Sequence, residues 1–389
     1  MKWDLMAGSK KTEIAIVGHL VDADLVLAEI LMRQGAKVTV YRSSKADLPQ
    51  LNLPFYSRLR NKHVRFFYSS VRLFLELRKY GFVYSIGSSL LFSLRLMGVV
   101  FLFLKRFGNW PSYMVVCTGS NMSEQAVEKS LAGIAERISL KNASNIVLNH
   151  YPHALRNAAQ LGLTHSILLP FPYAVDCQAV APEVRAAEEG ETLRIFHPSH
   201  LDWGQADPGK ARNSTKGNDR FLRAFIKACQ NGLDAHCLLL DRGPDRKNAQ
   251  RLIRELGGDR YFTWKPNLTR DEYYSELAHC DLVIDQFDIE SFGGIAIEAM
   301  AHGKPVMGHV NEYCHSLTFD KEIPLLIAHS EEEIEAGLWQ CENRAFLNAK
   351  ALECWEWVRQ YENPEVLGRR YLAYAQIAMG DLRIAQFCG

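Results

Sequence analysis

Residues 285–306 read DQFDIESFGGIAIEAMAHGKPV, and this stretch decides the fold. An apolar run that begins at residue 282 and ends at Asp285 is typical of a buried strand, and the short loop after it carries Glu290. Gly293 and Gly294 then open a helix on which Glu298 lies. Small residues at a helix start let the unpaired N–H groups of the first turn approach a ligand oxygen.

The chemistry of this stretch points to a ligand that has both phosphates and hydroxyls. The helix start favours an anion, yet Glu290 and Glu298 flank it on the two sides. Two carboxylates beside a bound anion cost free energy unless they accept hydrogen bonds from hydroxyl groups. A nucleotide sugar meets both needs, with phosphates for the amides and hydroxyls for the carboxylates.

Outward from this stretch, strand-like and helix-like runs alternate along most of the chain. The predicted strands are 13–17, 36–41, 82–86, 113–118, 145–148, 166–169, 193–197, 235–240, 261–264, 282–285 and 305–308. The predicted helices are 22–34, 219–230, 247–256, 270–278 and 295–301, with mostly helix from 331 onward. Apolar strands that alternate with helices predict parallel sheets covered on both faces.

A break rich in proline and acidic residues divides this pattern into two halves. We therefore expect an α/β protein with two Rossmann-like, doubly wound domains facing a cleft: an amino-terminal domain at 1–175, a linker at 176–192 and a carboxy-terminal domain at 193–362. A final helix at 363–389 is expected to pack back on the first domain. Ligands of such sheets bind at the carboxyl ends of the strands.

The composition excludes several classes of protein. The 389 residues hold 45 Lys and Arg against 44 Asp and Glu, which argues against a nucleic-acid partner. The start lacks the apolar run of a secretory leader, and the nine cysteines have no framework spacing. No set of His and Cys has the spacing of a zinc site. We therefore expect a cytoplasmic protein with reduced thiols.

Positive charge is concentrated in residues 55–106, which hold ten Lys and Arg and a single acid, Glu76. Aromatic residues are interleaved with these charges. Such a segment is either a solvated face on ordinary helices or a surface that binds an anionic membrane. The second interpretation places the protein peripherally on the inner face of a membrane and suits a lipid-linked or anionic acceptor.

The stretch 285–306 strongly resembles the signature of retaining glycosyltransferases of the two-domain B fold (GT-B), above all family 4. Their pattern is Glu-x7-Glu with Phe-Gly after the first Glu and Glu-Ala-Met-Ala-x-Gly-x-Pro-Val at the second, and Glu290 and Glu298 match its spacing. Three further segments resemble family elements in the correct order. They are Lys216-Gly217-Asn218, Trp264-Lys265-Pro266-Asn267-Leu268 and Cys117-Thr118-Gly119-Ser120-Asn121.

The resemblance implies a role for each matching residue. Glu290 would contact hydroxyls of the transferred sugar and Glu298 the ribose, while amides from Phe292 to Gly294 hold the diphosphate or the sugar. Lys216 would neutralise the leaving group. The implied base-binding residues are Trp264, Pro266 and Leu268, and the implied acceptor-side residues are Gly18, His19, Thr118, Asn121 and His150.

The chain departs from the family pattern at one cation. The usual Gly-Arg before the lysine is Ser199-His200 here, and an insertion follows at 204–213. Either Arg212 supplies the missing charge or His200 substitutes as a neutral donor. The family's frequent histidine in the first domain is Thr118, and its glycine-rich first loop is reduced to Gly18-His19.

These features predict a retaining, metal-independent glycosyltransferase with no cofactor. It would move a sugar from a nucleoside-diphosphate sugar, for which UDP is the family's commonest choice, to a saccharide, lipid-linked or small-molecule acceptor in glycan, glycolipid or glycosylated-metabolite biosynthesis. Two alternatives stay open at this point: a B-fold nucleotide-sugar epimerase and a non-catalytic nucleotide-sugar-binding protein. A Rossmann dehydrogenase is disfavoured because no Gly-x-Gly-x-x-Gly follows the first strand.

Overall fold

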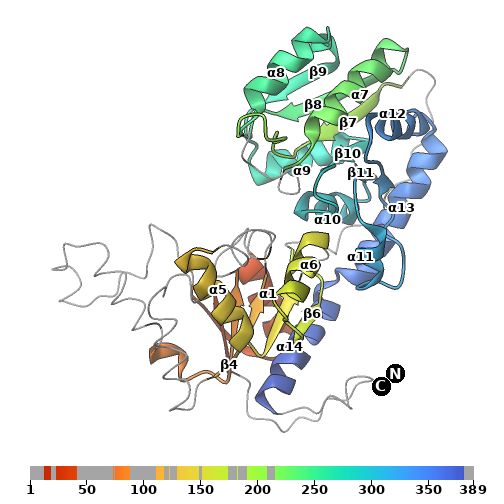
Figure 1. Cartoon of the computed structure of the whole chain (residues 1–389). Helices are drawn as coiled ribbons and strands as arrows, with labels where there is room; N and C mark the ends of the chain where they lie inside the picture. Colours follow the sequence, from red (N-terminus) through yellow and green to blue (C-terminus); the bar gives the residue numbers. More distant parts are fainter. Residues whose placement is uncertain are drawn as a thin grey trace, which may run out of the picture. The chain divides into compact units, whose positions relative to one another are not determined.

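The computed structural model divides the chain into two compact α/β units (Figure 1). It describes residues 13–18, 23–41, 73, 75–87, 111–117, 122, 129–148, 151–173, 182, 191–207 and 215–380. The first unit combines the chain up to 173, apart from 150–152, with residues from Pro364 onward. The second unit comprises residues 150–152 and the continuous segment Ala174–Asn363.

The first unit is built on a six-stranded parallel sheet with the strand order β2-β1-β3-β4-β5-β6. The strands are β1 (Glu13–Val17), β2 (Lys37–Tyr41), β3 (Phe82–Ile86), β4 (Ser112–Val116), β5 (Asn145–Leu148) and β6 (Ser166–Leu168). The helices that flank them are α1 (Ala23–Arg33), α5 (Leu131–Asn142), α6 (Pro152–Gln160) and α14 (Pro364–Met379). All five residues of β3 are buried, as expected for a strand covered on both faces.

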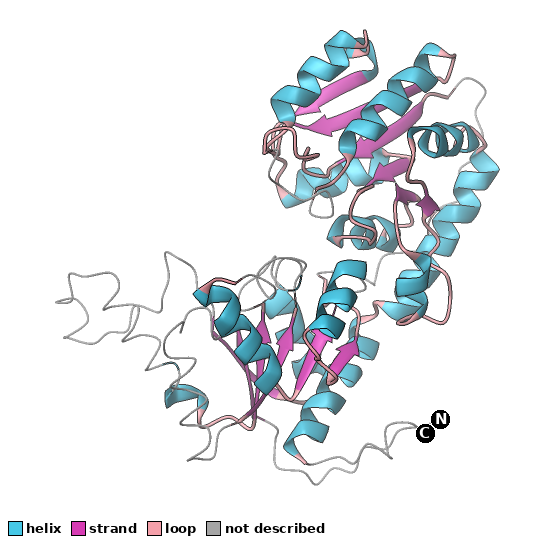
Figure 2. Ribbon diagram, in the orientation of Figure 1, coloured by secondary structure: helices cyan, strands magenta, loops and turns pink. Residues whose placement is uncertain are grey.

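The second unit has its own six-stranded parallel sheet, ordered β12-β11-β10-β7-β8-β9. Its strands are β7 (Leu193–His197), β8 (Ala235–Leu240), β9 (Phe262–Lys265), β10 (Leu282–Ile284), β11 (Val306–Gly308) and β12 (Leu326–Ile327). Its helices are α7 (Asn218–Gln230), α8 (Arg246–Glu255), α9 (Arg270–His279), α10 (Gly294–Ala301), α11 (Glu312–Ser316), α12 (Glu331–Gln340) and α13 (Arg344–Tyr361), with a 3-10 turn η4 (Asp259–Tyr261). Figure 2 shows the helices around each sheet.

The two doubly wound parallel sheets confirm the predicted fold class. Most predicted strands begin and end within one or two residues of the observed ones, because buried parallel strands leave a continuous apolar signal. The sequence did not yield α5, α6, α11 or the two-residue strand β12. Helix α6, for example, is short, and polar residues interrupt its apolar positions, so its sequence gives no apolar run to follow.

The last described helix, α14, belongs to the first unit and packs against α1. The two helices approach so closely that a Cβ on Gly368 would lie 2.6 Å from the backbone oxygen of Ile30. The Tyr371 side chain is fully buried, its hydroxyl donates to Pro170 O at 2.9 Å, and its own carbonyl accepts from the Tyr84 hydroxyl. Helix α14 therefore completes the core of the first unit.

The basic segment 55–106 lies mostly outside the described residues. Within its described part, Lys79 pairs with Glu76 at 2.7 Å, and both side chains are exposed. No helix among the described residues is long and apolar enough to cross a membrane. The membrane interpretation of this segment stays a prediction.

We expect Tyr371→Phe to loosen the docking of α14. The change leaves the buried Pro170 carbonyl without its donor, which costs about 1–3 kcal/mol of unfolding free energy. Hydrogen exchange of the α14 amides should accelerate accordingly, and the matched change Tyr313→Phe, at a side chain that is 72% exposed, should leave it unaltered. Unchanged exchange in Tyr371→Phe would show that the hydroxyl does not hold the helix.

Candidate functional site

The candidate site lies at one edge of the second sheet, where β7, β8 and β10 end. These three strands are adjacent and parallel, so the loops that leave their carboxyl ends meet. Backbone hydrogen bonds join the loops: Leu201 N donates to Arg242 O at 3.1 Å, and Lys216 N donates to Asp202 O at 2.6 Å. Phe287 N donates to Lys216 O at 2.8 Å, so Lys216 is held on both sides.

Asp285 organises the loop after β10. Its carboxylate is buried and accepts from Gly293 N at 2.9 Å and from the Ser199 hydroxyl at 3.4 Å. Burial raises the pKa of Asp285, while the positive charge of Lys216 and the two hydrogen bonds partly offset that rise. The bond to Gly293 sets the start of α10, so a residue eight positions earlier fixes where the helix amides point.

Lys216 is held against the same loop by its side chain. Its ammonium donates to the Gln286 amide oxygen, and the Gln286 amide nitrogen donates to Ser291 O. Gly217 follows with a φ of 62°, and a Cβ there would meet Asp288 at 2.9 Å. The glycine of this Lys-Gly pair is thus required by the geometry, because only glycine fits both the left-handed backbone and the narrow space.

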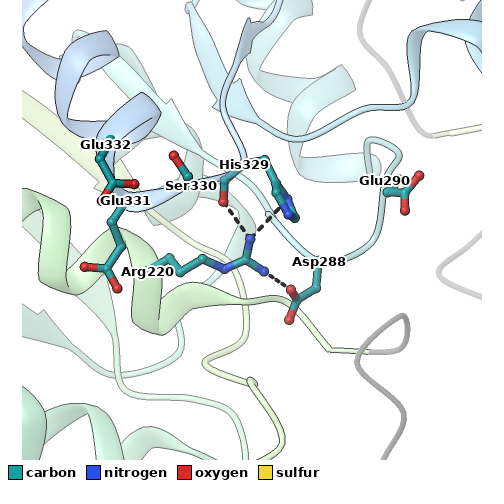
Figure 3. Close-up of a pocket in the computed structure, with 7 residues that line it drawn as sticks. All are labelled: Arg220, Asp288, Glu290, His329, Ser330, Glu331 and Glu332. Carbon is teal, nitrogen blue, oxygen red and sulfur yellow. Dashed lines mark hydrogen bonds and ion pairs between the residues drawn. The ribbon is translucent and has the colours of Figure 1, made fainter.

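Glu290 lines a cavity of 590 Å³ in the second unit (Figure 3). The Glu290 carboxylate accepts from the Asn311 amide nitrogen at 2.9 Å, and Asn311 N donates to Glu290 O at 3.0 Å. The remaining lining residues are Arg220, Asp288, His329, Ser330, Glu331 and Glu332. Arg220 forms an ion pair with Asp288 and donates to His329 O at 2.6 Å, and the Glu290 carboxylate lies apart from this cluster.

Glu298 lies one turn into α10 and is partly buried. Burial raises the pKa of Glu298, although the Arg270 guanidinium and the Tyr273 hydroxyl both favour its charged form. Burial also raises the pKa of Tyr273, and the negative charge of Glu298 adds to that rise. A desolvated carboxylate beside a cation and a hydroxyl is a strong acceptor for ligand hydroxyls.

A second cavity, of 490 Å³, lies at the carboxyl ends of β8 and β9. It is lined by His200, Asp241, Arg242, Gly243, Arg246, Asn267 and Leu268. Partial burial lowers the pKa of His200, and the charges of Arg242 and Lys216 lower it further. His200 is therefore a neutral imidazole at neutral pH.

The predicted carboxy-terminal residues are divided between two cavities: Glu290 lines the first, and His200 and Leu268 line the second. Pro266 and Leu268 lie in the loop after β9, but Trp264 is part of that strand and packs against the hydrophobic core. Phe292 is buried against the rings of His315 and Trp357, so only its backbone can face a ligand. The Gly293 amide is already bonded to Asp285, which leaves Gly294 and the residues after it as the candidate anion donors.

The predicted acceptor-side residues are mostly undescribed. Gly18 follows β1 with a φ of 124° and donates its amide to Tyr41 O at 3.1 Å. Outside the described residues lie His19, Thr118, Asn121, His150 and Arg212. Their predicted roles stay predictions.

The sequence analysis assigned no role to the hydrogen-bonding pair Asp285 and Gln286 or to Arg242. A role for Asp285 and Gln286 could have been suspected, because both come directly after a buried strand. Arg242 has the same signal, since it follows the apolar run of β8 by two residues. Within the described part of the chain, no cluster of three or more His, Cys, Asp or Glu side chains could hold a metal ion.

The segment that forms most of this edge matches a known protein family. Residues 210–337, which include Lys216, Glu290 and Glu298, match the family model for glycosyl transferases group 1. A 2-deoxystreptamine glucosyltransferase of Streptomyces kanamyceticus is 26% identical over 208 residues, which are 52% of this chain and 51% of that protein. The chain thus spans about half the length of this curated relative.

Solved structures share the fold of the chain at low sequence identity. HepE of Anabaena, in complex with UDP and glucose, has a TM-score of 0.61 at 13% identity, covering 93% of this chain and 98% of that one. A sucrose-phosphate synthase of Thermosynechococcus elongatus has a TM-score of 0.63 at 16% identity, covering 94% and 99%. A putative UDP-N-acetylglucosamine 2-epimerase of Listeria monocytogenes also matches, with a TM-score of 0.52 at 13% identity, 96% and 98% covered.

The family match and the shared fold together support the GT-B glycosyltransferase superfamily. The fold alone does not separate transferases from epimerases, because a putative epimerase shares it. The discriminating residues are therefore those at the sheet edge.

We expect Asp285→Ala to loosen the start of α10. The Gly293 amide loses a charged acceptor, and hydrogen bonds to charged groups are worth about 1.5–3 kcal/mol. Hydrogen exchange should speed up in residues 293–298, whereas the exposed control Asp234→Ala should leave it unchanged. In Asp285→Asn, which keeps an acceptor oxygen, the exchange rate should lie between those of wild type and Asp285→Ala. Full protection of α10 in Asp285→Ala would refute this role.

Proposed function

We propose that the chain is a retaining glycosyltransferase that moves a sugar from a nucleoside-diphosphate sugar, with UDP the favoured nucleotide, to a hydroxyl acceptor. The observation that carries the proposal is the buried Asp285, which fixes the start of α10 with Glu290 before it and Glu298 after it. This arrangement lies inside the segment that matches the glycosyl transferases group 1.

Each group at the edge then has a chemical task. The amides of the first α10 turn bind diphosphate oxygens, because they have no acceptor within the helix. The partly desolvated Glu298 carboxylate accepts from the two ribose hydroxyls. Glu290, held by Asn311, accepts from hydroxyls of the transferred sugar. Lys216, anchored on Gln286, stabilises the charge that develops on the leaving diphosphate.

The proposed reaction occurs on one face of the sugar. The bond from the anomeric carbon to the diphosphate oxygen breaks as the bond to the acceptor oxygen forms, and the acceptor proton passes to the departing diphosphate. No side chain is assigned as a covalent nucleophile, which agrees with a front-face substitution and retention. The proposal needs no metal, because Lys216 and the helix amides supply a positive field.

Two separate observations bear on the acceptor. The Streptomyces kanamyceticus relative is named for glucosyl transfer to 2-deoxystreptamine, which supports a glucosyl donor and a small hydroxylated acceptor. The basic segment 55–106 instead supports a lipid-linked or anionic acceptor at a membrane surface. We retain a saccharide, lipid-linked or small-molecule acceptor as the proposed class.

A ligand screen followed by product analysis tests the function. We expect one of UDP, GDP and ADP to raise the unfolding temperature, since a ligand at 100 times its Kd stabilises by about 2.7 kcal/mol. The matching nucleotide sugar should then release or transfer its sugar with retained anomeric configuration, as read by NMR. Release of an epimerised sugar would make the protein an epimerase, and binding without turnover would make it a binding protein.

The two glutamates should separate binding from turnover. Glu298→Gln should weaken nucleotide binding by about 1.5–3 kcal/mol, whereas Glu290→Gln should mainly lower kcat. Burial raises the pKa of Glu298 above its ordinary 4.5, and the charged form is the better acceptor. Nucleotide affinity should therefore fall as the pH drops toward that raised pKa, and Glu298→Gln should lose this pH dependence. Equal nucleotide affinity in wild type and Glu298→Gln would remove the residue from the site.

A further inference from the structure

Arg242 occupies a fixed place at the edge of the candidate site. It follows β8 by two residues, and its guanidinium donates through Nε to Pro198 O at 3.0 Å and through Nη2 to the same oxygen. The following Gly243, with a φ of 110°, lies so close to Leu201 that a Cβ would come within 2.4 Å of the Leu201 carbonyl oxygen. The backbone and two of the guanidinium nitrogens are therefore held against the Pro198–Leu201 loop.

The loop that carries Arg242 is also held at its other end, where α8 begins. The buried carboxylate of Asp245 accepts the backbone amides of Trp203, Gln205 and Ala206 at 2.8, 3.3 and 2.6 Å. This carboxylate ties the start of α8 to the loop after β7. The cavity of 490 Å³ that Arg242 lines takes residues from these two joined loops and from the loop after β9, which supplies Asn267 and Leu268.

Arg242 differs from the arginines that line the two cavities beside it in having no carboxylate partner. Arg220 pairs with Asp288, and Arg246 pairs with Asp241 at 3.9 Å. Among the residues that the structure describes, no carboxylate forms an ion pair with Arg242. Its guanidinium is also partly buried, and that burial lowers its pKa. A desolvated cation without a counter-charge is unfavourable unless an anion binds it.

The field of Arg242 reaches the same imidazoles as that of Lys216. Both cations lower the pKa of His200, which lines the cavity with Arg242. Both also lower the pKa of His197, which burial brings to about 4. The Tyr273 hydroxyl in turn partly offsets the lowering of the Arg242 pKa by burial.

We propose that Arg242 binds the diphosphate of the nucleotide donor and supplies the cation that Ser199-His200 omits. The inference rests on the proposed function and names a residue within that site. The guanidinium of Arg242 keeps Nη1 and one N–H of Nη2 for phosphate oxygens, and a planar fork suits such a pair. His200 stays neutral beside it. The family pattern places this positive charge in the loop after β7, whereas Arg242 supplies it from the loop after the neighbouring strand β8. Arg212 is therefore not needed for this task.

Binding of a nucleoside diphosphate and of its own nucleoside tests this proposal. Calorimetric titration of the best binder among UDP, GDP and ADP should show a Kd raised about tenfold or more in Arg242→Gln, with little change for the nucleoside. The effect should shrink as salt rises, because the contact is between charges. Arg242→Lys should retain part of the affinity. The exposed Arg254 on α8 gives the matched control Arg254→Gln, which should bind like wild type.

The outcomes separate this inference from the proposed function. Wild-type binding with an unchanged Kd in folded Arg242→Gln would overturn the role of Arg242 alone. Equal weakening of diphosphate and nucleoside would also overturn it, since the residue would then shape the pocket rather than bind phosphate. A wild type that binds none of the three diphosphates would overturn the proposed function, and this inference with it.

Discussion

The candidate site depends on one buried hydrogen bond, from the Gly293 amide to the Asp285 carboxylate. It closes the loop that leaves β10 and fixes the first turn of α10, so the positions of Glu290 and Glu298 follow from it. The bond is costly to build, because burial raises the pKa of Asp285 and disfavours its charge. Lys216 and Ser199 offset part of that cost, and both belong to the loop region after β7.

The core of the second unit reaches directly into this loop. Phe287, two residues after Asp285, is fully buried and stacks at 6.5 Å with Phe221 of α7, which in turn stacks at 5.5 Å with Phe225. The amide of Phe287 binds the carbonyl of Lys216. Site residues on α7 and in the loop after β10 are thus positioned by one hydrophobic cluster, and rigid support of this kind is what preorganised donors require.

The sequence was sufficient for the fold class, for most strands and for the start of α10, for a physical reason in each case. Buried parallel strands such as β7 and β8 give unbroken apolar runs, and Gly293-Gly294 marks a helix start. Contacts that depend on tertiary packing could not be predicted: the apolar pattern could not show that Phe292 packs inward or that the Trp264 side chain packs against the hydrophobic core. Arg242 looked like an ordinary charge after a strand, since nothing local reveals that it lacks an acidic partner.

The chain order of the two units has a consequence for how the protein is made. The second unit is almost wholly one continuous segment, whereas the first needs α14, which is synthesised after it. On a translating ribosome the core of the second unit can fold before α14 has been synthesised. Until then the face of α1 around Ile30 is not yet covered by Gly368 and Tyr371. The sheet that begins at Glu13 is therefore among the last parts of the molecule to be finished, and its partly covered surface is where chaperones would act during synthesis.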